Sequence, residues 1–524
     1  MHTRPTLAEV LDYNGPAQLA AVALELLADG DTPLTLLRKL GGDRPGAFLL
    51  ESIEGGEQLA RYSFVGVDIK RTLCATASAV TWHHRDSAEK SPSADPLTAL
   101  QQWLAQRPVW TRSDLPSLQG GAVGYLAFDA VASFEPKVQL PPCPAQPHGS
   151  HPDLPISQWL LADEVCIFDH CKQRIALVVQ MPLDGDRALA YAEVQRRLQG
   201  RLAQLQQPLP AEAPWPVEPA DLANLPIVAN RSRQDLEQAV LRAQQAIAEG
   251  EVFQVVLSRR LTVEVAVPPL DLYRALRAVS PSPYMFFLRF SEFCVVGASP
   301  EVLVRVENRQ LLVRPIAGTR PRGANAAEDQ ALSEDLLQDA KELAEHRMLV
   351  DLGRNDVGHV AAPGSVRVEH PEHIEKFSHV QHLVTDVRAQ LAKDKTAFDA
   401  LRAAFPAGTV SGAPKVRACQ LLAELEPDRR GLYAGAVGYF DHQGNMDTCI
   451  AIRTLLVEPG RVHVQTGAGV VRDSVPALEA DECDNKARGS LTALALALQR
   501  NRSVHHETNA PQAARAVVAA AAGR

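Results

Sequence analysis

The chain has 524 residues, a length that predicts two to four domains. Its composition, 46% hydrophobic and 22% charged, is typical of a soluble globular protein, and its formal charge of −9 gives no electrostatic reason to bind nucleic acid or an anionic membrane. The sequence contains no apolar run long enough for a membrane span and its start lacks a signal-peptide pattern, so we expect a cytoplasmic protein.

The first part of the chain, residues 1–207, is predicted to mix short strands with helices and to form an amino-terminal domain. A glycine-rich apolar run at 120–131 indicates close backbone approach or tight bends. The other elements expected here are a helix over 17–40, two strands of an antiparallel meander at 46–55 and 61–69, a helix near 97–105, a β-hairpin over 164–180 and a helix over 186–206.

Six prolines in residues 208–226 mark the clearest linker of the sequence. Beyond it, residues 227–500 are predicted as a larger domain, and the alanine-rich residues 501–524 as a mobile tail. Strands and helices follow one another without regular alternation, which favours an α+β fold with large antiparallel sheets forming a sandwich and helices around it. The elements expected here are helices at 232–249, 270–279, 334–356 and 475–498, and strands at 250–265, 284–290, 293–299, 311–323, 434–440, 447–457 and 461–471.

Two helices of the larger domain place carboxylates three residues apart. In the helix over 334–356, apolar residues from Leu336 to Met348 predict one buried face, while Glu342, Glu345 and His346 project from another. Carboxylates so close repel each other unless they are solvated or hold a cation, and a Glu342–His346 pair on a wet face is the alternative.

The closing helix repeats this pattern with Glu479 and Glu482, followed by Lys486 one turn later. Such a ladder of charges is common on exposed helix faces. Two Glu-x-x-Glu helices in one domain nevertheless make a shared Mg²⁺ site a reasonable hypothesis, with some of the four carboxylates acting through water.

Groups able to bind anions lie between these helices in the sequence. Gly467, Ala468 and Gly469 follow a strand and could turn their backbone N–H groups toward an anion, or simply form a tight turn. Arg453 stands in an apolar strand, where its charge needs a ligand carboxylate or a structural Glu. Further donors are Tyr433, Gly318 and Thr319. These groups and a metal together would suit a dicarboxylate substrate.

The eight cysteines show neither a CxxC pair nor a spacing typical of a zinc site. None stands beside a glycine-rich elbow with a histidine partner, as a cysteine nucleophile requires. The sequence therefore excludes a glutaminase site on this chain.

Ten segments, in this order, carry a resemblance to a known family: FQVVLSRR, SPSPYMFFL, GASPE, RPIAGTRPRG, AEHRMLVDLGRNDVG, FPAGTVSGAPK, YAGAVGYF, AIRT, QTGAG and EADECDNKA. Over roughly residues 45–495 the chain resembles the chorismate-utilising enzymes, and among them component I, the large subunit, of anthranilate synthase. The resemblance implies an α+β fold of large antiparallel sheets. It also implies Mg²⁺-dependent amination of chorismate at C2 and elimination of pyruvate, which gives anthranilate for tryptophan biosynthesis.

The resemblance assigns roles to the residues singled out above. Glu345 and Glu482 match the Mg²⁺ ligands, with Glu342 and Glu479 as water-mediated companions. Glu301 matches the general acid that assists loss of the C4 hydroxyl, and His382 the histidine linked to pyruvate elimination. The residues that match chorismate contacts are Gly318, Thr319, Tyr433, Arg453 and the turn Gly467, Ala468, Gly469, with Lys486 nearby on the closing helix.

Two positions distinguish the relatives. Isochorismate synthases carry a lysine base where this chain has Gln254, and aminodeoxychorismate synthases a lysine where it has Ala317. With neither amine present, the nucleophile implied is ammonia, supplied from glutamine by a separate amidotransferase subunit. The alternatives are aminodeoxychorismate synthase component I, disfavoured by Ala317, and a catalytically inactive tryptophan sensor, which should have lost at least one of the catalytic or metal-binding residues that are present here.

A regulatory site is also implied by the resemblance. Ser52, together with Pro283, Tyr284 and Met285, matches the pocket in which tryptophan acts as a feedback inhibitor. Without the resemblance, Ser52 would be read as an ordinary strand residue. An effector bound between the amino-terminal part and the larger domain could bias their relative position.

Overall fold

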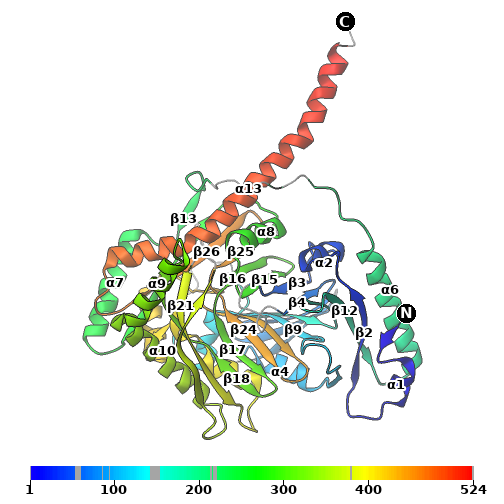
Figure 1. Ribbon diagram of the computed structural model, residues 1–524, viewed down its shortest axis with the longest axis horizontal. Coiled ribbons are helices and arrows are strands. Elements are labelled where there is room, and N and C mark those ends of the chain that lie inside the picture. Colours follow the sequence, from blue (N-terminus) through cyan, green and yellow to red (C-terminus); the bar gives the residue numbers. More distant parts are fainter. Residues whose placement is uncertain are drawn as a thin grey trace.

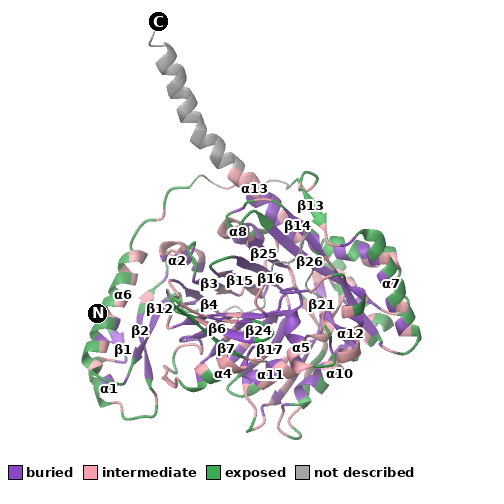
Figure 2. Cartoon of the chain, turned by 180° about the vertical axis from the view of Figure 1, so that it is seen from behind, coloured by how far each residue is buried: buried purple, intermediate pink, exposed green. Residues whose placement is uncertain are grey.

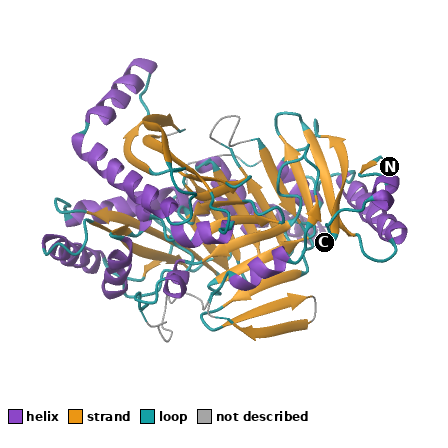
Figure 3. Cartoon of the chain, turned by 90° about the horizontal axis from the view of Figure 1, so that it is seen from below, coloured by secondary structure: helices purple, strands orange, loops and turns teal. Residues whose placement is uncertain are grey.

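The computed structural model describes residues 2–53, 61–84, 87–93, 95–141, 154–212, 215, 221–377 and 380–521, with side chains described as far as Asn501. Two large β-sheets form its centre, and helices cover their outer faces (Figures 1 and 3). Every strand pair is antiparallel except β2 with β8. The expected α+β class with large antiparallel sheets is confirmed. No helix in the described ranges is long and apolar enough to cross a membrane.

The first sheet joins strands from both ends of the chain. Its strands, in spatial order, are β1 (Thr3–Arg4), β2 (Leu19–Leu27), β12 (Arg174–Pro182), β11 (Glu164–Asp169), β4 (Tyr62–Gly66), β3 (Ala47–Glu51), β15 (Tyr284–Arg289), β16 (Cys294–Ser299), β25 (Thr454–Glu458), β26 (Arg461–Val470), β14 (Gln254–Val263) and β13 (Ile227–Ala229), with β8 (Val109–Trp110) beside β2 and β22 (Gly412–Ala413) beside β14.

The second sheet is assembled in the same way. Its strands, in spatial order, are β19 (Ile316–Pro321), β21 (Val380–Gln390), β18 (Gln310–Val313), β17 (Val302–Glu307), β24 (Met446–Ile450), β23 (Ala436–Asp441), β9 (Gly121–Leu126), β10 (Ser157–Ala162), β5 (Arg71–Ala75), β6 (Ala79–His84) and β7 (Ser87–Pro92), with β20 (Arg367–Lys376) beside β21.

Helices surround the sheets, and buried residues concentrate on the strands between them (Figure 2). The helices are α1 (Leu7–Asp12), α2 (Pro33–Lys39), α4 (Thr98–Ala105), α5 (Val131–Phe134), α6 (Arg187–Leu205), α7 (Arg233–Ala248), α8 (Pro269–Val279), α9 (Ala326–Gln338), α10 (Ala340–Gly358), α11 (Ala397–Ala404), α12 (Lys415–Leu425) and α13 (Pro476–Ala521), with short 3-10 turns η1 (Phe128–Ala130) and η2 (Gly408–Val410).

Both sheets continue across the predicted boundary at 208–226. In the first sheet β3 pairs with β15, and in the second β9 pairs with β23. Glu212 of the linker forms ion pairs with Arg38 of α2 and with Arg274 and Arg500, which lie on α8 and α13. Residues 208–226 therefore divide the chain, but they do not separate independently packed sheets.

The helix predicted over 17–40 is wrong, because most of that range is strand β2 followed by the shorter helix α2. Residues 19–24 are buried, and β2 pairs with β12 along its whole length. Alanine and leucine favour a helix in isolation, but pairing and burial within a sheet override that preference. Helix α2 begins at Pro33 after a capping box made by Thr32 and Thr35.

The helix predicted over 334–356 is two helices, α9 and α10, which meet at Asp339. The Asp339 side chain accepts hydrogen bonds from the N–H groups of Lys341 and Glu342 and so begins α10. The predicted buried face is also only partly correct. Leu336 is buried, but Leu337 is 40% exposed, and His346 points into the core, with its Nε2 2.6 Å from Thr385 Oγ1.

Three predicted elements in the larger part of the chain have different bounds. The strand over 311–323 divides into β18 and β19 at Arg314–Pro315, where the proline lacks an N–H for the ladder. The strand over 447–457 divides into β24 and β25. The closing helix continues beyond the expected end at 498 as far as Ala521, consistent with the high helix propensity of alanine. The mobility of residues 501–524 stays a prediction.

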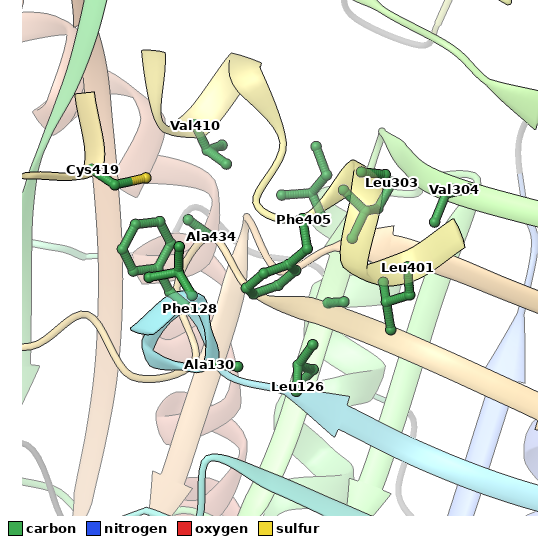
Figure 4. Packing of buried hydrophobic residues seen from close by; sticks show 14 of the residues in the cluster. Leu126, Phe128, Ala130, Leu303, Val304, Leu401, Phe405, Val410, Cys419 and Ala434 are labelled. Carbon is green, nitrogen blue, oxygen red and sulfur yellow. The ribbon is translucent and has the colours of Figure 1, made fainter. Parts of the chain in front are cut away.

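An apolar cluster between the second sheet and helices α11 and α12 supports the segment that ends at η2 (Figure 4). Phe405 and Val410 flank this segment and are buried beside Leu303, Leu401 and Cys419. Thr409 lies between these two residues, so the apolar core fixes the position of its backbone.

Candidate active site

A cavity of about 1010 Å³ lies between helices α10 and α13, above the ladder of β14 and β26. Nearly all of the predicted catalytic, substrate-binding and metal-binding residues line it. They are Gln254, Glu301, Gly318, Thr319, Glu342, Glu345, His382, Tyr433, Arg453, Gly467, Gly469, Glu479, Glu482 and Lys486. Ala468, the one exception, belongs to the buried core, because side chains alternate between the two faces of a strand. Residues 467–469 lie within β26 and pair with β14, so the prediction that they form a turn after the strand is wrong.

Two glycines make room on the cavity floor. In the β14–β26 register, Gly467 lies opposite Ser258 and Gly469 opposite Val256. A Cβ atom on Gly467 would come within 2.6 Å of Tyr433 Oη, and one on Gly469 within 2.8 Å of Gln254 Nε2. Both positions therefore need glycine so that neighbouring polar side chains can reach the floor.

One hydrogen bond orients the amide of Gln254. Its Nε2 donates a hydrogen bond of 3.0 Å to Glu345 Oε1, so its amide oxygen faces the other way. That oxygen is buried and has no hydrogen-bond partner among the described residues. An unpaired buried acceptor is costly, which marks it as a point where a ligand donor would be favourable.

The two pairs of glutamates line the cavity from different helices, one pair on α10 and the other on α13. Burial and the charge of Glu345 raise the pKa of Glu342, while burial also raises the pKa of Glu479, to which Glu482 adds. The positive charge of Lys341 on α10 lowers the pKa of Glu479 on α13 and so partly offsets this rise, as expected if the two helices approach closely.

These carboxylates suit a hard divalent cation, although they do not form a complete ligand set. Within the ranges that the structure describes, no three His, Cys, Asp or Glu side chains are close enough to hold a metal ion by themselves. Mg²⁺ usually takes only one or two carboxylates and completes its octahedron with water and substrate oxygens. Two glutamate pairs that line one cavity match that chemistry.

Glu301 follows β16 and is held as a neutral acid. Burial raises its pKa to about 8, although Thr409 Oγ1 donates a hydrogen bond of 2.9 Å to its Oε1 and favours the charged form. The positive charges of Lys486 and Arg453 act in the same direction as Thr409. At neutral pH the side chain can therefore give a proton to a ligand.

His382 on β21 has a defined tautomer. Its Nδ1 lies 2.9 Å from the Gly318 carbonyl oxygen, which can only accept, so Nδ1 carries the proton and Nε2 is left with a lone pair. Burial lowers the pKa of His382, which keeps the ring neutral. Thr319 Oγ1, 3.1 Å from Nδ1, limits ring rotation.

Arg453 is positioned differently from the expectation of a buried strand residue. It stands between β24 and β25 with a φ of 49°, is only partly buried, and its carbonyl oxygen accepts a 3.1 Å hydrogen bond from Ala298 N–H. The turn removes it from the ladder and brings it to the cavity.

Lys486 Nζ contacts both the Gly467 carbonyl oxygen, at 3.0 Å, and Glu482, at 2.6 Å.

The family model described as chorismate binding enzyme matches residues 47–492 of the chain. The chain belongs to the chorismate-binding enzyme family. Curated relatives named anthranilate synthase component 1 include one from Pseudomonas putida, 45% identical over 91% of this chain and 96% of its own length. Another, from Thermus thermophilus, is 46% identical over 90% and 97%. The predicted resemblance is confirmed.

Solved structures of similar proteins agree with this family assignment. Anthranilate synthase component I from Streptococcus pneumoniae superposes with a TM-score of 0.71, at 34% identity over 89% of this chain and 99% of that one. The menaquinone-specific isochorismate synthase from Escherichia coli, 21% identical with a TM-score of 0.66 over 93% and 98%, shows the shared fold.

A second cavity of this chorismate-binding enzyme, about 590 Å³, contains the four residues expected to form a regulatory site. Ser52, Pro283, Tyr284 and Met285 line it, because β3 pairs with β15. Tyr284 Oη donates a 2.9 Å hydrogen bond to Asp447, which also pairs with Arg305 at 2.7 Å. The catalytic cavity is close by, since Ser280 lines it only three residues before Pro283.

Sequence reasoning missed several residues that shape the catalytic cavity. Thr409 lies in the segment FPAGTVSGAPK, which was recognised as a motif without a role for its threonine. Gln465 opens the segment QTGAG and also lines the cavity. The buried ion pair of Glu426 and Arg430 could not be predicted, because the sequence shows only that the two residues are four apart.

Proposed function

We propose that the protein is the large subunit of anthranilate synthase, which converts chorismate and ammonia into anthranilate, pyruvate and water. The observation that carries this proposal is the meeting, in one cavity, of a neutral buried acid, an oriented neutral histidine and two glutamate pairs. Relatives of that name, similar over nine-tenths of the chain, support the same assignment.

In the first half of the reaction, Glu301 is the acid and ammonia is the nucleophile. Glu301 gives its proton to the C4 hydroxyl, which leaves as water, while the lone pair of ammonia forms the bond to C2. The unpaired oxygen of Gln254 can accept an N–H of ammonia without taking its proton. The adduct first carries an ammonium group at C2, and its loss of one proton replaces the proton that Glu301 gave up. The resulting aminodeoxyisochorismate keeps the enolpyruvyl group.

The second half aromatises the ring. His382 Nε2, with its lone pair, takes the proton from C2 as the C3–oxygen bond breaks, and the methylene carbon of the leaving group is protonated to give pyruvate. Arg453, Tyr433 and the N–H groups near Gly467 and Gly469 would hold the enolpyruvyl carboxylate meanwhile.

We assign the metal-binding role to Glu345 and Glu482, with Glu342 and Glu479 acting through water. Bound there, Mg²⁺ would neutralise and orient the ring carboxylate of chorismate. The chain itself contributes the four carboxylates. Gln254 Nε2 donates a hydrogen bond to Glu345, and Lys486 Nζ pairs with Glu482, so two of the four are held in place.

The absence of an amine at two particular positions favours anthranilate over the products of related enzymes. Gln254 and Ala317 both line the cavity, and neither can act as a base or form a covalent bond to C2. Ammonia would come from glutamine through a separate amidotransferase subunit, since this chain lacks a cysteine nucleophile motif. Tryptophan would inhibit from the second cavity.

A product assay tests the proposal. Purified protein with chorismate, Mg²⁺ and ammonium chloride should produce anthranilate fluorescence and an equal amount of pyruvate, with no glutamine or second subunit added. The matched control omits ammonium. Formation of 4-amino-4-deoxychorismate or isochorismate instead would contradict the assignment.

A further inference from the structure

Gln465 on β26 lines the catalytic cavity but has no role in the chemistry described so far. Its side chain is largely buried, and its Nε2 donates a 2.8 Å hydrogen bond to Ser258 Oγ on the neighbouring strand β14. Gln465 faces the same side of the ladder as Gly467 and Gly469, because residues two apart on a strand share a face. It therefore extends the cavity floor beyond the two glycines.

A buried ion pair contacts this part of the floor through Ser258. Glu426 and Arg430 are both buried, with Arg430 Nε 2.8 Å from Glu426 Oε2 and Nη2 2.8 Å from Oε1. Two further donors, the backbone N–H and the hydroxyl of Ser258, each lie 2.8 Å from Oε1. A carboxylate that accepts four such bonds, two from a guanidinium, is ionised and can only accept.

The direction of each hydrogen bond follows from that ionised carboxylate. Ser258 has one hydroxyl proton, which it must donate to Glu426, so its oxygen can only accept from Gln465. The amide nitrogen of Gln465 must therefore face Ser258. A flipped amide would bring two oxygens with lone pairs to 2.8 Å, so the carbonyl oxygen Oε1 is left for the cavity.

The same ion pair fixes other parts of the cavity wall. Arg430 donates to the carbonyl oxygens of Val410, at 2.6 Å, and of Val256, and both residues line the cavity. Its guanidinium also lies 5.5 Å from the ring centre of Tyr433. One buried charge pair thus joins η2, β14 and Tyr433 around the floor that carries Gln465.

We propose that Gln465 contacts the reactants by accepting a hydrogen bond from a neutral N–H or O–H donor, and that Glu426 and Ser258 are positioning residues that orient it. The proposal rests on the proposed function, whose reactants offer two such donors: ammonia and the C4 hydroxyl of chorismate. A carbonyl oxygen repels carboxylates, so Gln465 would also keep the enolpyruvyl carboxylate over Gly467 and Gly469.

Two conservative variants and their combination test the chain of hydrogen bonds. Gln465→Met removes the carbonyl oxygen at similar volume, and Ser258→Ala removes the partner that prevents the amide from flipping. We expect each to raise one KM by about 3- to 10-fold, the loss of one neutral hydrogen bond, with kcat changed less. The double variant should be no worse than Gln465→Met, because both changes remove one contact.

The control is Ser333→Ala. Ser333 is likewise hydrogen-bonded to a buried glutamine, with its Oγ donating to Gln381 Oε1 at 2.5 Å, but neither residue lines the catalytic cavity. This variant should lose a comparable amount of thermal stability and keep both KM values. If Gln465→Met proves too unstable to assay, Gln465→Leu provides the same comparison.

The two KM values separate the possible donors. A rise in the KM for ammonium identifies ammonia as the donor, and a rise in the KM for chorismate identifies its C4 hydroxyl; either supports the proposal. Parental values for both, or additive effects in the double variant, would overturn it. A parent protein that makes no anthranilate would instead contradict the proposed function.

Discussion

Thr409 and Glu301 come from distant parts of the chain and meet at 2.9 Å on the wall of the catalytic cavity. Their hydrogen bond works against the burial that raises the pKa of Glu301 to about 8, because a donated hydrogen bond stabilises the carboxylate. The balance keeps Glu301 protonated at neutral pH while leaving its proton available to a substrate.

The first prediction concerns pH. Activity should fall as pH rises through about 8, because Glu301 then loses the proton that it must donate. In Thr409→Val the lost hydrogen bond no longer favours the carboxylate, so the fall should move upward by about half to one pH unit. The measurement is kcat/KM for chorismate between pH 6 and 10 at fixed total ammonium.

Free ammonia increases with pH equally for parent and variant, so the difference between their profiles reports Glu301. Thr409→Ser keeps a hydroxyl donor and should restore the parental profile. A Thr409→Val profile that coincides with the parent, or that falls at lower pH, would contradict the assignment of Glu301 as the acid.

The second prediction concerns the acidic pair on α13. Glu482→Ala should abolish turnover and Mg²⁺ binding but lower thermal stability little, because its side chain is 46% exposed and its ion pair is with Lys486, 49% exposed. Asp484→Ala is the matched control, since Asp484 lies on the same helix, pairs with Arg259 and does not line the cavity. Calorimetric titration with Mg²⁺ in the presence of chorismate measures the effect. Full turnover in Glu482→Ala would remove the argument for the metal.

The third prediction compares the two floor glycines. In Gly469→Ala the new Cβ meets the amide end of Gln254, which can move, so activity should fall at least about tenfold while stability changes little. In Gly467→Ala the Cβ meets the Leu257 backbone oxygen at 2.7 Å as well as Tyr433, so stability should fall by roughly 1–3 kcal/mol. Thermal unfolding and kcat measured together distinguish the two. Equal stability losses would show that Gln254 is not free to give way.

The sequence could predict the site more completely than the fold. Glu301, Glu345, Glu479 and Glu482 stand within the quoted motifs, and all four line the cavity. The range 17–40 was misread because alanine-rich β2 has helical composition, and only its pairing with β12 makes it a strand. The break at Asp339 depends on a single capping side chain within a continuous helical pattern.

Contacts between distant segments were the least predictable feature. Glu426 reaches Ser258 across 168 residues, and Thr409 reaches Glu301 across 108, so no local pattern links either pair. Arg453 was expected in a continuous strand, whereas tertiary contacts with Ala298 hold it in a left-handed turn. The shared sheets likewise arise from pairing between strands on both sides of the linker.

The last prediction concerns regulation through the second cavity. Tryptophan should inhibit the parent, and Ser52→Ala should need at least about fivefold more tryptophan for the same inhibition, because Ser52 lines that cavity and not the catalytic one. Uninhibited kcat should be unchanged. The segment from Ser280 to Pro283 borders both cavities, so a ligand in one can shift the wall of the other. Because such coupling is reciprocal, chorismate should weaken tryptophan binding in calorimetry. Equal inhibition of parent and variant would rule out the pocket, and binding unaffected by chorismate would rule out the coupling.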